Sequence, residues 1–137
     1  MKQVTVLVVE DNRVVFELIK TALTTYPRQY GYQYRVIHAP DGVYGLERAW
    51  NLHPDIILLD IQLPRLNGYE VLQSLRLGGN TTPVIMMTAN TEKDEQRKSF
   101  QAGCNAFLTK PLKPSFLHCY IQELLRDETV PLKGEQF

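Results

Sequence analysis

Asp55-Ile56-Ile57-Leu58-Leu59-Asp60 is the stretch that decides the fold, because an unbroken aliphatic run ends abruptly in a carboxylate. Such a run is typical of a strand buried on both faces in the middle of a parallel sheet. A charge is costly in an apolar core, so Asp60 must lie where the strand leaves the sheet. Ligands of open α/β sheets bind at the carboxyl ends of the strands. The residues that meet Asp60 should therefore define the function.

Length and composition favour a single globular domain without a membrane segment. The chain has 137 residues, and Lys+Arg equals Asp+Glu at 15 each, which gives no overall argument for binding nucleic acid or a membrane surface. No apolar run approaches the roughly 18 residues of a membrane span, and the N-terminus lacks a signal-peptide core. Cys104 and Cys119 show no metal or redox spacing. We expect reduced, partly buried thiols in a cytoplasmic protein.

Strand-like and helix-like segments alternate along the chain. Strands are expected at 4–9, 34–39, 56–60, 83–87 and 106–109, and helices at 13–25, 43–50, 69–77, 92–102 and 114–124. Apolar residues recur at helical spacing in most of these helices, as in the predicted buried stripes Val15-Leu18-Ile19-Ala22 and Val43-Leu46-Ala49-Trp50. The 92–102 segment is polar all round, with Phe100 and Ala102 almost its only apolar anchors, so we expect a lightly held helix.

This alternation predicts an α/β fold, with a parallel sheet covered by helices on both faces. The domain is expected to span residues 1–126. Residues 127–137 are expected to be a polar C-terminal tail that is too short to form a separate domain.

Charged and polar side chains end four of the five expected strands, namely Glu10-Asp11, Asp60, Thr88 and Lys110. Each alone has an ordinary explanation as a turn or cap residue. The ends of parallel strands share one edge of the sheet, so together they predict a site. Three carboxylates repel one another unless a cation lies between them, and Mg²⁺ prefers such oxygen ligands.

Two other ligands suit this edge less well. The acidic turn after the first strand would repel the phosphate of a nucleotide cofactor. Zinc would prefer His and Cys, and His38, His53 and His118 lack ligand spacing. Phosphoryl transfer fits better, with Asp60 as the nucleophile that forms an aspartyl phosphate. Mg²⁺ and Lys110 would neutralise the phosphoryl oxygens, and Thr88 would donate to one of them.

These residues resemble the marks of a response-regulator receiver domain of two-component signalling, in its stand-alone, chemotaxis-regulator-like form. Pro64 and Gly68 follow Asp60 at the family's spacing, and the Thr88-Ala89 and Lys110-Pro111 pairs complete the pattern. The resemblance implies a flavodoxin-like, doubly wound three-layer α/β/α fold. Its five-stranded parallel sheet would have the order 2-1-3-4-5.

The resemblance also implies a role for each site residue. Asp60 would accept a phosphoryl group from a histidine kinase or phosphotransfer protein, with Lys110 paired to that group. Asp11 and Asp60 would bind Mg²⁺ directly, Glu10 through water, and the backbone carbonyl of Gln62 would complete the shell. In the family, the positions of Gln62 and Asn90 tune the lifetime of the phosphoryl group.

Switching is implied in the same way. Thr88 would move toward the phosphoryl group and Phe107 would turn inward, while the Lys110–Pro111 peptide bond would be cis. The face formed by residues 92–126 would then meet a downstream protein. An apolar patch of Phe116 with Tyr120 would permit a homodimer, although the same spacing suits core packing.

The expected function is therefore a single-domain response regulator that is phosphorylated on Asp60 in the presence of Mg²⁺ and signals by altered protein contacts. We expect no direct DNA binding and no enzyme activity beyond weak self-phosphorylation and autodephosphorylation. Three alternatives remain. One is a phosphorylation-independent receiver-like interaction module, and another is a receiver fragment of a hybrid kinase. The third is a Mg²⁺ phosphatase, which would need an acid where Gln62 stands.

Overall fold

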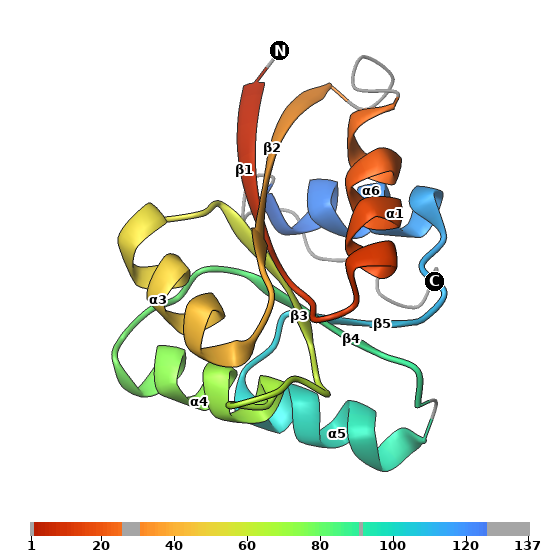
Figure 1. The fold of residues 1–137 in the computed structure, drawn as a ribbon. Helices are drawn as coiled ribbons and strands as arrows, with labels where there is room; N and C mark the ends of the chain where they lie inside the picture. Colours follow the sequence, from red (N-terminus) through yellow and green to blue (C-terminus); the bar gives the residue numbers. More distant parts are fainter. Residues whose placement is uncertain (1, 26–30, 91, 126–137) are drawn as a thin grey trace.

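The computed structural model describes residues 2–25, 31–90 and 92–125. Within them a five-stranded parallel sheet has the order β2-β1-β3-β4-β5, and helices cover both of its faces (Figure 1). The elements are β1 (Lys2–Val9), α1 (Arg13–Thr24), β2 (Tyr32–Ala39), α3 (Gly42–Leu52), β3 (Ile56–Asp60), α4 (Gly68–Leu77), β4 (Val84–Thr88), α5 (Lys93–Ala102), β5 (Ala106–Thr109) and α6 (Pro114–Leu125). The predicted fold class and strand order are confirmed.

Two apolar cores flank the sheet, as expected for central strands that are buried on both faces. Val8 and Leu58 belong to the core beneath α1 and α6, whereas Leu7 and Leu59 belong to the core beneath α3 and α4. Every residue of β3 is buried, including Asp60 at its end. The opening run of the sequence is thus the centre of the molecule.

Three residues that were expected to be buried are exposed, although Ile19 and Ala49 of the predicted stripes are buried. Leu18 is 65% exposed, because α1 packs on the sheet through Phe16 and Leu23 together with Ile19. Trp50 is 40% exposed, because Gly42, Gly45 and Ala49 form the buried side of α3. In α5 the expected anchor Phe100 is 47% exposed and Ser99 is fully buried. Periodicity located each helix, but did not select which of two neighbouring stripes faces the sheet.

Two strands begin earlier than predicted, since β1 starts at Lys2 and β2 at Tyr32. Parallel register pairs Val9 with Ala39, and Thr88 with Thr109, so the carboxyl ends of the strands lie at one edge of the sheet. The predicted tail, residues 127–137, lies outside the described residues.

Candidate functional site

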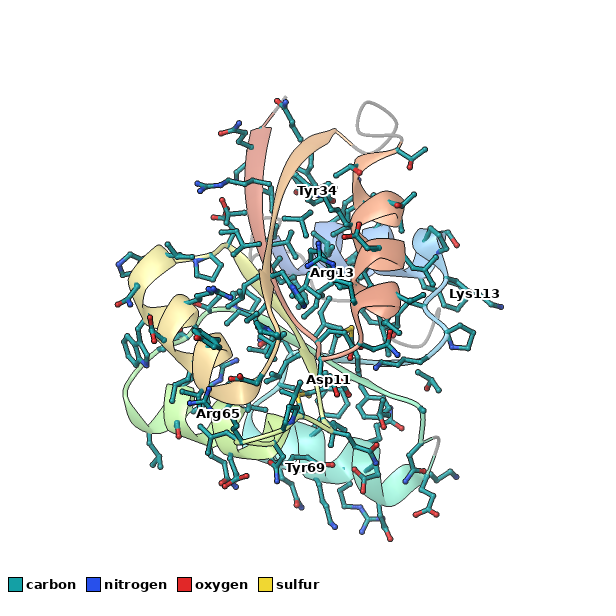
Figure 2. All side chains as sticks on the ribbon, in the orientation of Figure 1. Asp11, Arg13, Tyr34, Arg65, Tyr69 and Lys113 are labelled. Atoms are coloured by element: carbon teal, nitrogen blue, oxygen red, sulfur yellow. The ribbon has the colours of Figure 1, made fainter. Side chains whose placement is uncertain are left out.

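A cleft of about 330 Å³ opens at this edge and gathers most of the predicted site residues. Figure 2 shows Asp11 just beyond the end of β1. The lining residues are Glu10, Asp11, Asn12, Val15, Asp60, Gln62, Thr88, Ala89 and Lys110. Residues separated by up to a hundred positions therefore meet, because four strands end together.

The three acids and Lys110 form the polar centre of the cleft. Carboxylate oxygens of Glu10, Asp11 and Asp60 all lie within 4.8 Å of one another. The Nζ of Lys110 donates to Oδ2 of Asp60 at 2.9 Å and also to Oε1 of Glu10. The backbone N–H of Gln62 donates to the other Asp60 oxygen at 3.1 Å. Both oxygens of Asp60 are thus held by donors.

Burial and mutual repulsion perturb the charges of this cluster. Burial, reinforced by the neighbouring Asp60, raises the pKa of Glu10 to about 7, although Lys110 opposes the shift. Burial lowers the pKa of Lys110, but its hydrogen bonds to Glu10 and Asp60 outweigh this effect and raise the pKa overall. Lys110 therefore stays protonated, and a second cation would relieve the remaining repulsion between the acids.

The donor set fits Mg²⁺. Magnesium prefers oxygen ligands at about 2.0–2.1 Å, which places the oxygens of an octahedral shell about 3–4 Å apart. The three carboxylates offer oxygens that all lie within 4.8 Å of one another, and Asp11 is exposed, which leaves room for water. Glu10, Asp11 and Asp60 would hold such an ion. The carbonyl of Gln62 as a further ligand stays a prediction.

Local sequence explains why the acids lie here. Asn12 caps α1, accepting from the backbone N–H groups of Val14 at 2.9 Å and Val15 at 3.1 Å, so the chain turns directly after the acidic pair. On the other side of the cleft, Gly68 begins α4 against the backbone of Asp60. A Cβ at this glycine would lie 2.4 Å from the Asp60 carbonyl oxygen. The short loop after β3 depends on that close approach.

The predicted switch residues have clear positions. The hydroxyl of Thr88 accepts from the backbone N–H of Asn90 at 3.0 Å, and the Asn90 side chain accepts from the N–H of Glu92 at 2.9 Å. Hydrogen bonds thus connect the site to the residue that precedes α5. Phe107 is half-buried against the core beneath α3 and α4, and the Lys110–Pro111 bond is cis.

Sequence reasoning missed Tyr69 and Glu95. They help to line a second cleft of about 450 Å³, which shares Asp11, Gln62 and Thr88 with the first. The hydroxyl of Tyr69 donates to the Glu95 carboxylate and so joins α4 to α5. Burial and Glu95 raise the pKa of Tyr69 to about 12. The available signal was the position of Tyr69 in the first turn of a helix that starts at the site.

An apolar groove of about 400 Å³ lies beside Lys110, between α1 and the segment that leads into α6. Its walls include Leu18, Pro111 and Leu117. Leu18, mispredicted as buried, and Val14 on the same helix are 65% and 68% exposed. Exposed aliphatic side chains thus surround one side of the site.

Comparisons with known proteins agree with this arrangement. The family model described as the response regulator receiver domain matches residues 6–122. The chain is 35% identical over 131 residues to Response regulator MprA of Mycobacterium sp. (strain KMS), covering 96% of this chain and 54% of that protein. It is 33% identical over 121 residues to the alkaline phosphatase synthesis transcriptional regulatory protein PhoP of Bacillus subtilis (strain 168), and the match covers 88% of this chain and 48% of that protein. The chain spans about half the length of these relatives.

Solved structures are similar as well. The signal receiver domain of a putative Luxo repressor protein from Vibrio parahaemolyticus has a TM-score of 0.81 and 28% identity, covering 90% of each chain. The receiver domain of sensor histidine kinase PA1611 from Pseudomonas aeruginosa PAO1 has a TM-score of 0.77 and 34% identity, covering 90% of this chain and 98% of its own. That structure has a magnesium ion coordinated in its active site cleft. Within residues 2–25, 31–90 and 92–125 of the present chain, no helix is suited by length and apolarity to cross a bilayer.

Proposed function

The chain belongs to the response regulator receiver domain family of two-component signalling, and from that premise we propose that Asp60 is its phosphoryl acceptor. The carrying observation is that Asp60 ends a fully buried strand with its two oxygens held by Lys110 and the amide of Gln62. Two further carboxylates, of Glu10 and Asp11, lie within 4.8 Å. This is the set that a carboxylate nucleophile, a phosphoryl group and Mg²⁺ require.

In the proposed reaction, a bond forms between phosphorus and a carboxylate oxygen of Asp60. The bond from phosphorus to an imidazole nitrogen of the donor breaks, and its electron pair stays on that nitrogen. Mg²⁺, when bound by the acids, supplies positive charge to the phosphoryl oxygens. Lys110, which donates to Asp60, would supply a second positive charge. The hydroxyl of Thr88, which accepts from the N–H of Asn90, would donate its own proton in a hydrogen bond to a phosphoryl oxygen.

The donor is proposed to be a histidine kinase or phosphotransfer protein. Its phosphohistidine must reach Asp60, so the donor must dock on surface next to the cleft. The groove beside Lys110 supplies apolar area there, with Leu18 and Val14 exposed on α1. Apolar contacts of this kind can hold two proteins in register while a buried carboxylate reacts.

The output is proposed to be a change in protein contacts at the face of α5, β5 and α6, in a single-domain regulator of the cytoplasm without direct DNA binding. A homodimer through Phe116 belongs to the same proposal, since this side chain is 36% exposed. Tyr120 packs against the core beneath α1 and α6, so it contributes less to such a contact. Support for a switch at this face comes from the hydrogen bonds that connect Thr88 through Asn90 to Glu92.

Incubation with acetyl phosphate and Mg²⁺ tests the proposal. The intact mass should rise by one phosphoryl group, and the gain should be absent in Asp60→Asn and without Mg²⁺. Beryllofluoride should shift backbone amide resonances of β4 and α5. An unchanged mass and spectrum would favour a phosphorylation-independent interaction module. Sustained hydrolysis of phosphate esters that requires Asp60 would favour a phosphatase instead.

A further inference from the structure

His38 is the last residue but one of β2, and its ring contacts the backbone that carries the acidic cluster. Its Nε2 lies 2.8 Å from the carbonyl oxygen of Glu10. The β1–β2 ladder ends with the Val9–Ala39 pair, after which the N–H of Glu10 donates to the carbonyl of Ala39 at 3.0 Å. The His38 contact therefore holds the next backbone group along, the carbonyl between Glu10 and Asp11.

The imidazole is itself held firmly. It stacks on Phe16 of α1, with ring centroids 4.0 Å apart and an interplanar angle of 24°. The carbonyl of His38 accepts from the guanidinium of Arg48, so α3 restrains the same residue from the other side. A carbonyl oxygen can only accept, so Nε2 must carry the proton and donate. His38 is half-buried, which limits competition from water.

We propose that His38 is a positioning residue for the metal site, which fixes the peptide plane that links two acidic ligands, Glu10 and Asp11. The inference rests on the proposed function, since it assumes that these acids hold Mg²⁺. Rotation of this peptide would move the Asp11 carboxylate relative to those of Glu10 and Asp60. Groups that orient metal ligands without touching the metal typically change affinity by roughly 10–100-fold when they are removed.

A purely packing role for the ring makes a different prediction. If His38 only fills space against Phe16, a side chain of similar size should preserve the site. His38→Leu keeps apolar contact with Phe16 but removes the donor, whereas His38→Gln keeps an N–H donor on a flexible side chain. His53→Asn is the matched control, because His53 lies before β3 at the opposite edge of the sheet and has a positive φ of 46°, which asparagine tolerates.

The test is the dissociation constant for Mg²⁺, measured from the amide shifts of Asn12 and Gln62. We expect His38→Leu to bind Mg²⁺ about tenfold more weakly, at the low end of the effects known for such groups. His38→Gln should restore much of the affinity and His53→Asn should match the wild type. The ¹⁵N spectrum of neutral His38 should show the tautomer with the proton on Nε2.

Several results would overturn this role. If His38→Leu bound Mg²⁺ as tightly as the wild type, or if His38→Gln bound it no more tightly than His38→Leu, the role of His38 would be limited to packing. A proton on Nδ1 of neutral His38 would exclude the hydrogen bond itself, even if the leucine variant failed to fold. If the wild type bound no Mg²⁺, the metal site and the role of His38 would both be wrong. If the wild type bound Mg²⁺ and the His38 variants bound it equally well, the proposed function would stand and the role of His38 would be wrong.

Discussion

Replacing Gly68 by alanine should disturb both stability and the site, because this residue begins α4 against the backbone of β3. The new Cβ would lie 2.4 Å from the Asp60 carbonyl oxygen and 2.8 Å from Cα of Ile61. Real Cβ contacts are rarely shorter than 3.0 Å, so helix and strand end must separate by at least the difference of 0.6 Å. Overpacking lowers the free energy of unfolding by about 1–3 kcal/mol, whereas the higher helix propensity of alanine raises it by at most about 1 kcal/mol.

Since the atoms in the way are backbone rather than flexible side chain, we expect the upper end of that range, a net loss of about 2 kcal/mol. Urea unfolding without Mg²⁺ measures the loss, and the Mg²⁺ dissociation constant reports any displacement of Asp60. Gly45→Ala is the control, because the three atoms nearest to its Cβ would all belong to the side chain of Val9, the closest at 2.7 Å. A Gly68→Ala protein as stable as the wild type, or no less stable than Gly45→Ala, would refute the reasoning.

Three further predictions follow from the contacts and pKa shifts of single residues. Tyr69→Phe removes the hydrogen bond to the Glu95 carboxylate, so amide exchange at the start of α5 should rise and stability should fall by about 1 kcal/mol; unchanged α5 protection in hydrogen-exchange mass spectrometry would contradict this. The pKa of Glu10 rises from 4.5 to about 7, so its contribution to the stability of the metal-free protein is complete below pH 4.5 and is lost as the pH rises through about 7. Mg²⁺ competes with this proton, so it should raise the melting temperature more at about pH 8 than at about pH 6, and Glu10→Gln should abolish that difference. Burial raises the pKa of Cys104 to about 12, so iodoacetamide at about pH 8 should label this thiol only after unfolding; rapid labelling of the native protein, located by peptide mass spectrometry, would show that the thiol is accessible.

The sequence was sufficient for the fold because its strongest signals are local. An apolar run such as Ile56–Leu59 indicates a central strand wherever it occurs, and the polar residue after each strand is placed by the topology of a parallel sheet. The choice between Leu18 and Leu23 as a buried residue of α1 depends on how helix and sheet meet. That geometry is set by the whole core rather than by the helix's own sequence.

The two tertiary hydrogen bonds that the sequence did not reveal were missed for the same physical reason. The Tyr69–Glu95 hydrogen bond joins residues of two helices, and the His38–Glu10 contact joins the ends of two strands. Neither pair has a spacing that a one-dimensional pattern could detect, because each depends on how separate elements pack. His38 was dismissed as one of three scattered histidines, and only its contact with the Glu10 carbonyl connects it to the site.

The sparse attachment of α5 has a consequence for how proteins of this design diversify. Among the residues of α5, all of which the structure describes, Ser99 alone is buried. Substitutions at the outward positions, including the half-exposed Phe100, leave the core untouched and should cost little stability. If α5 belongs to the partner-binding face, as proposed, its sequence can therefore change after a gene duplication while Asp60 and its neighbours are preserved. Under the proposed function, partner specificity can thus change on α5 without altering the residues proposed to carry out phosphorylation.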